Sequence, residues 1–277
     1  MARTQYVRDF KGEAPFVIPD TPIGLTIAGS DCSGGAGLQI DMKIFQRLQV
    51  YGLSVATAIV AEVPGKVVSV QAVPAVVVAD QLGVIMETYP VGAAKTGMFH
   101  DAEQVGVAVK HLKAWKRRDP TAWLVVDPVM VATSGTLLLQ AEAIHVLKSE
   151  LLPLADLVTP NLPEAGVLLN REVNEAPIDL AKALASDLGI NVLLKGGHAK
   201  GHHAVDHLVT TTGMTTFDVE RLPGPTVHGT GCALSAAITA GLASGLVLEE
   251  AVSKAKDVLT EAMREPFILG SVRSLRI

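Results

Sequence analysis

Short apolar runs alternate with helical patterns along most of the chain. Runs rich in Val, Leu, Ile and Ala predict strands at 23–28, 53–61, 92–95, 123–127, 156–159, 191–195 and 207–211. The intervening stretches predict helices at about 37–48, 75–89, 101–117, 140–151, 162–169 and 178–188. Because the strands are almost continuously apolar, we expect both of their faces to be covered. This alternation indicates an α/β fold with a doubly wound, mostly parallel sheet and helices on both faces.

The C-terminal part departs from this alternation. Residues 214–220 predict a strand antiparallel to 207–211, and two helices are expected at about 231–245 and 249–265. The chain contains no linker rich in Pro, Gly or Ser, no repeat and no low-complexity segment. We therefore expect one domain over residues 21–277, preceded by an irregular extension at 1–20.

The composition argues against several classes of protein. Of 277 residues, 49% are hydrophobic and 18% are charged, so the chain is expected to collapse into a folded state. The formal net charge is −5 and no basic stripe is present, which argues against a nucleic-acid partner.

Membrane insertion and export are not expected either. The longest apolar stretch, 67–79, is interrupted by Pro74 and polar residues, so it falls short of the roughly 20 residues that span a bilayer. Residues 1–19 lack an apolar core and contain acids, unlike a signal or transit peptide. The two cysteines, Cys32 and Cys232, form no disulfide framework, which favours a cytoplasmic protein.

Candidate ligand-binding residues follow the predicted strands. Ligands of an open α/β sheet bind beyond the carboxyl ends of its strands. Such places are occupied by the glycine-rich segment 29–37, Glu62, Asp127, the segment 159–161 and the segment 195–198. The strongest local signal is His228-Gly229-Thr230-Gly231-Cys232 at a helix start, where N–H groups and the helix dipole favour a phosphate or an oxyanion. The same field is expected to favour the thiolate of Cys232, although a tight turn into a packed helix also explains the segment.

Six motifs occur in a specific order. Alone, the segment 29–37 is neither a Walker A loop nor a dinucleotide fingerprint. The motifs are Ala28-Gly29-Ser30-Asp31 with Ser33-Gly34-Gly35-Ala36-Gly37, Lys95-Thr96-Gly97-Met98, Val126-Asp127-Pro128-Val129-Met130, Thr159-Pro160-Asn161-Leu162-Pro163-Glu164-Ala165, Leu194-Lys195-Gly196-Gly197-His198, and the 228–232 segment. Together they resemble the hydroxymethylpyrimidine/phosphomethylpyrimidine kinases of thiamine biosynthesis. These kinases are part of the ribokinase-like superfamily, which also contains pyridoxal kinases. The resemblance runs from about Ile23 to Met263.

The resemblance implies a ribokinase-like kinase that uses ATP and Mg²⁺ and phosphorylates a small pyrimidine. By similarity, the pyrimidine lies against Gly29, Asp41, Val60 and Glu62. ATP is expected to contact Lys195, Thr159, Asn161 and His228, and Mg²⁺ is expected at Asp127 and Glu164. Cys232 is expected to orient or deprotonate the acceptor oxygen, while the N–H groups of Gly229, Thr230 and Gly231 stabilise the transferring group.

Ordinary structural roles compete with several of these assignments. The alternatives are a solvated helical carboxylate for Asp41, a helix cap for Asn161 and Glu164, a lysine that reaches the sheet edge for Lys195, and a small buried residue for Cys232. Cys32 receives no role. The histidines His198, His202, His203 and His207 are expected on a mobile loop over the nucleotide, in preference to a zinc site.

One segment departs from the family pattern. Where the family usually has Gln-Asn-Thr-x-Gly-Val, this chain has Glu62-Val63-Pro64-Gly65-Lys66-Val67. A glutamine can donate to a ring nitrogen and accept from an amine, whereas an ionised glutamate can only accept. A buried mismatch of this kind costs roughly 1–3 kcal/mol unless a proton on Glu62 or on the ring relieves it.

Three functions therefore remain open. The first is a phosphomethylpyrimidine kinase that acts on the monophosphate and also on the free alcohol. The second is a pyridoxal-type vitamin kinase, and the third is a non-catalytic pyrimidine-binding sensor. The presence of Asp127, Glu164, Lys195 and Cys232 argues against the sensor. Family relatives are commonly homodimers, and the apolar region 67–79 fits either an interface or core packing.

Overall fold

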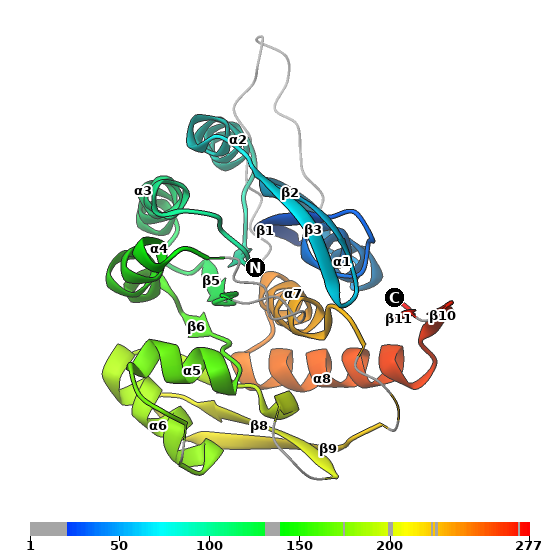
Figure 1. The fold of residues 1–277 in the computed structure, drawn as a ribbon. Helices are drawn as coiled ribbons and strands as arrows, with labels where there is room; N and C mark the ends of the chain where they lie inside the picture. The colour runs from blue at the N-terminus through cyan, green and yellow to red at the C-terminus, as the bar shows by residue number, and fades with distance from the viewer. Residues whose placement is uncertain are drawn as a thin grey trace.

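A mostly parallel sheet forms the centre of the molecule (Figure 1). The computed structural model describes residues 21–130, 139–173, 175–198, 202–222, 224, 227–270 and 272–277. Within these ranges the strands are β1 (Ile23–Asp31), β2 (Tyr51–Val63), β3 (Lys66–Ala72), β4 (Ala93–Thr96), β5 (Trp123–Val126), β6 (Leu157–Val158), β7 (Asn191–Leu194), β8 (His203–Val209) and β9 (Met214–Glu220). They hydrogen-bond in the order β3-β2-β1-β4-β5-β6-β7-β8-β9.

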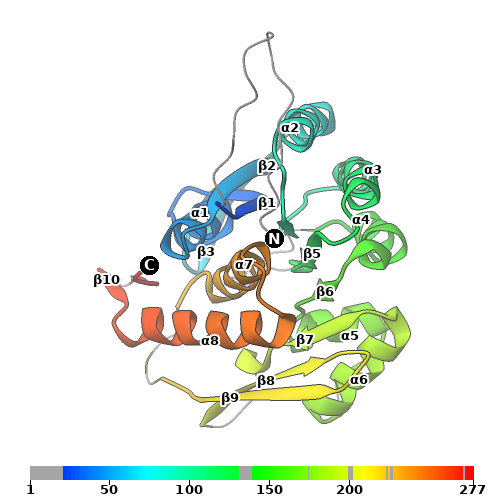
Figure 2. The ribbon, with the colours of Figure 1, turned by 180° about the vertical axis from the view of Figure 1, so that it is seen from behind.

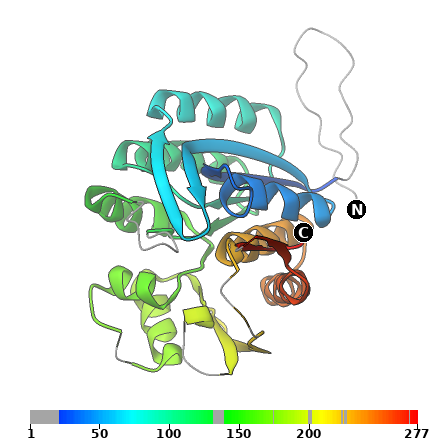
Figure 3. The ribbon, with the colours of Figure 1, turned by 45° about the vertical axis from the view of Figure 1, so that its right-hand side comes forward.

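The pairing changes from parallel to antiparallel at both ends of the sheet. Strands β2, β1, β4, β5, β6 and β7 are mutually parallel. Strand β3 pairs antiparallel with β2, and the hairpin β8–β9 is antiparallel to β7 and within itself. The two hairpins lie at opposite ends of the sheet in all three ribbon views (Figures 1, 2 and 3). The predicted antiparallel pairing of 214–220 with 207–211 is confirmed.

Helices cover both faces of this sheet. They are α1 (Gly37–Arg47), α2 (Ala75–Thr88), α3 (Ala102–Arg118), α4 (Ala141–Val146), α5 (Leu162–Leu169), α6 (Pro177–Leu188), α7 (Thr230–Ala243) and α8 (Leu248–Arg264). Alternate residues of β5 divide between two cores: Leu124 and Val126 pack with α2 to α6, whereas Val125 packs with α1, α7 and α8. Both strand faces are therefore buried, and the predicted doubly wound fold is confirmed.

Helix α7 is packed unusually closely against its surroundings. Its residues from Ala233 to Leu242 are all buried, and most are Ala, Gly, Ser or Thr. A Cβ added at Gly241 would lie 3.0 Å from the Cβ of Ala251 on α8. Small side chains thus allow α7 to lie between the sheet and α8 (Figure 2). This packing fixes the start of α7 at the carboxyl edge of the sheet.

Several predicted boundaries were wrong. Strand β3 lies in the stretch expected only to be apolar, and a short hairpin of β10 (Phe267–Leu269) and β11 (Val272–Ser274) follows α8. The expected helix 140–151 is α4 followed by a π-helical turn over Leu147–Leu151. Strand β8 begins at His203, so His203 and His207 lie on a strand and not on a loop. The expected extension 1–20 lies outside the described residues.

The sheet and helices leave no candidate for a membrane span. Across the described ranges, none of the helices is both long and apolar enough to cross a bilayer.

Candidate functional site

A cavity of about 390 Å³ opens at the carboxyl ends of β1, β2, β4, β5 and β7. Most of the predicted site residues line it: Gly29, Val60, Glu62, Asp127, Asn161, Glu164, Lys195, His228, Gly229, Thr230, Gly231 and Cys232. They come from segments far apart in the sequence, and the parallel strands bring them to one edge. Asp41 and Thr159, which were also predicted, are not among the lining residues.

The start of α7 forms one wall of this cavity. Gly229 precedes the helix with φ +80°, and a Cβ there would lie 1.7 Å from the carbonyl oxygen of Gly35. Only glycine therefore fits, because both the backbone angle and the contact exclude a side chain. The first N–H groups of α7 have no partner one turn earlier in the helix and are available to an anion, as the sequence predicts.

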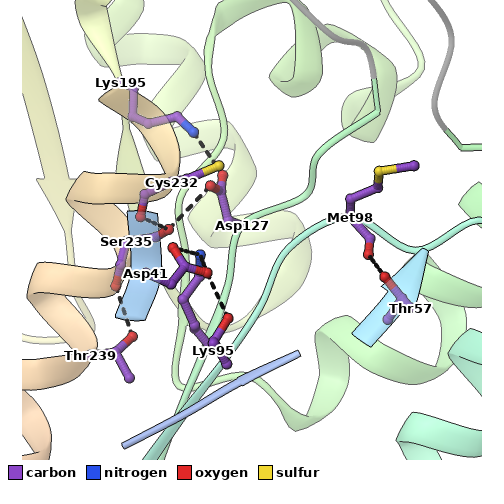
Figure 4. Close-up of polar contacts among 10 residues, drawn as sticks. Asp41, Thr57, Lys95, Met98, Asp127, Lys195, Cys232, Ser235 and Thr239 are labelled. Carbon is purple, nitrogen blue, oxygen red and sulfur yellow. Dashed lines mark hydrogen bonds and ion pairs between the residues drawn. The ribbon is translucent and has the colours of Figure 1, made fainter. Parts of the chain in front are cut away.

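Cys232 lies in the first turn of α7. Burial, together with Asp41 and Asp127, raises the pKa of the thiol to about 11, and Lys95 only partly opposes this. The surroundings of Cys232 therefore favour the thiol over the thiolate, which contradicts the expectation from the helix field. Figure 4 shows its sulfur beside Lys195 and Asp127, with the Asp41–Lys95 pair below.

Asp127 and Lys195 form the charged centre of the cavity. The Nζ of Lys195 donates to Oδ1 of Asp127 at 2.8 Å and lies 3.9 Å from Oε2 of Glu164. Ser235 donates to the other oxygen of Asp127 at 3.2 Å. Burial alone would raise the pKa of Asp127, but Lys195 and Lys95 hold it below its usual value.

Glu164 is the second carboxylate of this centre. Burial raises its pKa to about 7, although Lys195 opposes the shift. Glu164 and Asn161 also form a capping box at the start of α5, in which each side chain accepts from the other residue's backbone N–H. Glu164 therefore caps α5 and also lies close to the Asp127–Lys195 pair. Two carboxylates with one shared cation nearby offer the oxygen donors that Mg²⁺ prefers.

Asp41 lies behind the cavity wall. Its carboxylate is fully buried and accepts from the Nζ of Lys95 at 2.8 and 2.9 Å and from Thr26 at 2.6 Å. The structure thus gives Asp41 a buried cation as its partner, in place of either solvent or a ligand.

Lys95 belongs to one of the six motifs but was given no role in the site from the sequence. Its side chain is fully buried, yet it reaches the cavity. Burial alone would lower the pKa of Lys95, but the adjacent Asp41 carboxylate raises it above the usual value. A lysine in a short strand of otherwise small residues was the available signal, because a buried cation needs a partner.

The opposite end of the cavity is formed by Gly29, Val60, Glu62 and His228. His228, expected near ATP, lies here instead: its Nε2 is 3.0 Å from Oδ2 of Asp31. Asp31 also accepts from the N–H groups of Gly35 and Ala36, so it holds the glycine-rich turn in place. This end therefore carries two carboxylates and one imidazole.

Thr159 lies outside the lining of the cavity. Thr159 is buried, and its hydroxyl has no hydrogen-bond partner among the residues described. Sequence reasoning missed the apolar end, which is lined by Ala204, Val219, Leu259 and Met263 from β8, β9 and α8. Ordinary apolar residues on three elements carry no local motif that could have revealed it.

Comparisons with known proteins give a consistent answer. A family model described as phosphomethylpyrimidine kinase matches residues 31–275. The chain is 43% identical over 246 residues to a hydroxymethylpyrimidine/phosphomethylpyrimidine kinase of Rhizobium meliloti (strain 1021), covering 88% of this chain and 91% of the relative.

Solved structures of related proteins agree with the fold. A phosphomethylpyrimidine kinase from Clostridium difficile 630 is 38% identical with a TM-score of 0.75, covering 87% of this chain and 99% of that one. A Bacillus subtilis pyridoxal kinase in complex with ADP is 35% identical with a TM-score of 0.82, covering 92% and 97%. Thus this chain is similar to kinases of two vitamin classes.

Proposed function

The chain belongs to the phosphomethylpyrimidine kinase family, and from this membership we propose that its cavity transfers the terminal phosphoryl group of ATP to hydroxymethylpyrimidine phosphate and to the free alcohol. The chain is a phosphotransferase with a ribokinase-like fold. One observation carries the assignment of the site: the start of α7, the Asp127–Lys195 pair and the Glu62 end all face a single cavity. Such a transfer requires an anion hole, a cation and a recess for the heterocycle, and these three parts of the cavity supply them in that order.

ATP is proposed to bind along the side of the cavity formed by β8, β9 and α8. The apolar residues Ala204, Val219, Leu259 and Met263 suit a flat, weakly polar base. Lys195, at the inner end of this side, is proposed to contact the phosphates. Its present partner, Asp127, keeps the ammonium group buried and charged until the phosphates arrive.

Mg²⁺ is proposed to be held by Asp127 and Glu164. When bound, the ion would neutralise negative charge on the phosphate oxygens. The carboxylates themselves do the positioning: Asp127 is fixed by Ser235 and Lys195, and Glu164 by the capping box of α5. Both side chains are therefore preorganised before any ligand binds.

Cys232 is proposed to orient the acceptor hydroxyl of the pyrimidine. Because the pKa of its thiol is about 11, it is protonated at neutral pH and acts first as a hydrogen-bonding group. The N–H groups at the start of α7 face the position of the transferring group, where negative charge has to be stabilised. The acceptor proton leaves late in a loose transfer, so full deprotonation by Cys232 is not required before the phosphoryl group moves.

The substrate is proposed to insert its ring between Gly29, Val60 and Glu62. A pyridoxal-type kinase is the second candidate, because the chain is similar to a pyridoxal kinase and Glu62 replaces the family's usual glutamine. Release of ADP should be measured with hydroxymethylpyrimidine, its phosphate and pyridoxal in parallel, with Lys195→Met as the inactive control. Turnover with either pyrimidine supports the proposal, turnover with pyridoxal alone supports the second candidate, and no turnover supports the sensor.

A homodimer is proposed as the assembly. Ile59 and Val63 on β2, Val68 on β3, and Val76 and Val84 on α2 are exposed apolar side chains. Exposed apolar side chains that gather into a patch mark interaction surfaces. Analytical ultracentrifugation at micromolar protein should give the mass of two chains, and a mass near 29.0 kDa would refute the dimer.

A further inference from the structure

Glu62 has an unused carboxylate at the substrate end of the cavity. Among the residues that the structure describes, no group hydrogen-bonds to this carboxylate, although the thiol of Cys32 donates to the backbone oxygen of Glu62 at 3.3 Å. Glu62 follows an irregularity in the β2–β3 pairing between Ala61 and Glu62. Such irregularities redirect side chains, and here the Glu62 side chain faces the cavity.

Asp31 and His228 are the titratable groups that lie nearest to the Glu62 carboxylate. One oxygen each of Asp31 and Glu62 and one nitrogen of His228 lie within 4.8 Å of one another. Asp31 accepts from three backbone N–H groups and from the hydroxyl of Ser33, so it is ionised. His228 must therefore carry a hydrogen on Nε2, which it donates to Asp31.

This arrangement leaves the carboxylate of Glu62 without a hydrogen-bond donor among the described residues. Asp31 is satisfied by its donors, whereas Glu62 has only the neighbouring imidazole. Burial and the charge of Asp31 raise the pKa of Glu62, while His228 opposes the shift. The next basic residue along the hairpin, Lys66, pairs with Val63, so it lies past Glu62 towards the hairpin turn. The Glu62 end of the cavity therefore suits a ligand edge with two hydrogen-bond donors, one of them a protonated ring nitrogen.

We propose that Glu62 binds the aminopyrimidine as its protonated form, through the ring nitrogen and the adjacent exocyclic amine. This inference rests on the proposed function and specifies how the same site selects its substrate. One proton is taken from water and forms an N–H bond at the ring nitrogen; no bond of the protein breaks. The two parallel N–H groups then donate to the two oxygens of Glu62 as a charge-assisted pair.

The pairing distinguishes substrate classes. An amidine edge, a ring nitrogen next to an amino-bearing carbon, supplies two donors once it is protonated, which matches one carboxylate. A pyridoxal-like ring has no amino group next to its ring nitrogen and supplies only one donor. A glutamine at position 62 would instead pair with the neutral amidine edge, by donating to the ring nitrogen and accepting from the amine. The glutamate at position 62, in place of the family's usual glutamine, therefore makes the binding of the pyrimidine depend on pH.

Calorimetry can detect the proton directly. Hydroxymethylpyrimidine is titrated into the full chain at pH 6 to 9, in two buffers of different ionisation enthalpy. We expect uptake of about one proton per bound ligand at pH values above the ring pKa, and a loss of affinity of about tenfold per pH unit there. At pH values above the ring pKa, Glu62→Gln should take up no proton and its affinity should not change with pH. Glu249→Gln, an exposed change of equal charge on α8, should behave as the parent.

The outcomes separate the inference from the function on which it rests. Equal proton uptake by the parent and by Glu62→Gln would overturn the inference while leaving the kinase assignment intact. Binding of the pyrimidine by the parent without uptake of a proton would likewise overturn it. Glu62→Asp, which keeps the charge, should retain the proton uptake with weaker binding. Failure of every variant to bind the pyrimidine would refute the proposed function and the inference together.

Discussion

Replacing Asp41 with asparagine tests the buried ion pair that the structure places behind the catalytic cavity. Asp41 and Lys95 are both fully buried, and the ammonium nitrogen lies 2.8 and 2.9 Å from the two carboxylate oxygens. The asparagine side chain would keep the shape but remove the charge, which leaves the ammonium of Lys95 buried without its counter-ion. Thr26, which donates to Asp41, cannot supply the missing negative charge.

The expected loss of stability follows from this geometry. Removal of one partner from a buried pair costs about 3–5 kcal/mol. For a domain of this size each kcal/mol lowers the melting temperature by about 2–4 °C, so Asp41→Asn should lower it by about 6–20 °C. The double variant Asp41→Leu/Lys95→Met removes both charges and should recover much of that stability. It should still transfer phosphoryl groups poorly, because Lys95 lines the cavity.

Urea unfolding of the single and double variants measures this effect. Asp257→Asn, an exposed change of equal charge on α8, is the control and should lie within about 0.5 kcal/mol of the parent. A loss below about 1 kcal/mol for Asp41→Asn would refute the reasoning, since a buried pair broken on one side costs several times that amount. If that variant instead kept its stability and showed a raised KM for the pyrimidine, Asp41 would contact the substrate, as the family resemblance implies.

Four further predictions concern the cavity itself. Cys232→Ala should lower turnover at saturating ATP while leaving nucleotide affinity unchanged: by about 10²–10⁴-fold if the thiol also acts as a general base, and by less if it only orients the acceptor. Cys232→Ser should keep most activity if the thiol orients the acceptor, and a loss below about tenfold for alanine would limit Cys232 to packing or orientation. Alkylation of Cys232 by iodoacetamide, followed by mass spectrometry, should be slow at pH 8 and faster towards pH 11, because only the thiolate reacts. The exposed Cys32 should be labelled first. Equal rates of alkylation for Cys232 and Cys32 at pH 8 would contradict the raised pKa of Cys232. Asp127→Ala and Glu164→Ala should each raise the Mg²⁺ concentration that gives half-maximal rate. If either variant keeps the parent's Mg²⁺ dependence, the residue that was replaced does not belong to the metal site. At pH 8, Glu62→Gln should improve steady-state use of hydroxymethylpyrimidine more than use of its phosphate, since the phosphate has other anchors; equal changes would remove the selectivity argument.

The predictable part of the fold lies in its centre. Strands β1, β5 and β7 are buried on both faces, so their largely apolar runs were visible in the sequence. Strand β3 was missed because it is an edge strand without a fully buried residue, and hydrogen bonds to β2, not apolar burial, define it. The same holds for the exposed hairpin β10–β11.

The site was predictable where chemistry is local to a motif. Gly229 and Cys232 belong to one turn, and Asp127 and Lys195 each directly follow a strand, so their places followed from the sequence. Pairs between residues far apart in the sequence could not be predicted. Lys95 donates to Asp41, which lies 54 positions away. The protonation of Cys232 also depends on tertiary burial, which a local helix-dipole argument omits.

Direct detection of the product tests the central claim, that this cavity transfers a phosphoryl group from ATP to an aminopyrimidine. ³¹P NMR of the full chain with ATP, Mg²⁺ and hydroxymethylpyrimidine phosphate should show the pyrimidine diphosphate appearing at the same rate as ADP. Lys195→Met should abolish both signals. Formation of ADP with inorganic phosphate alone, or no consumption of ATP with the pyrimidines under conditions where pyridoxal is phosphorylated, would contradict the account.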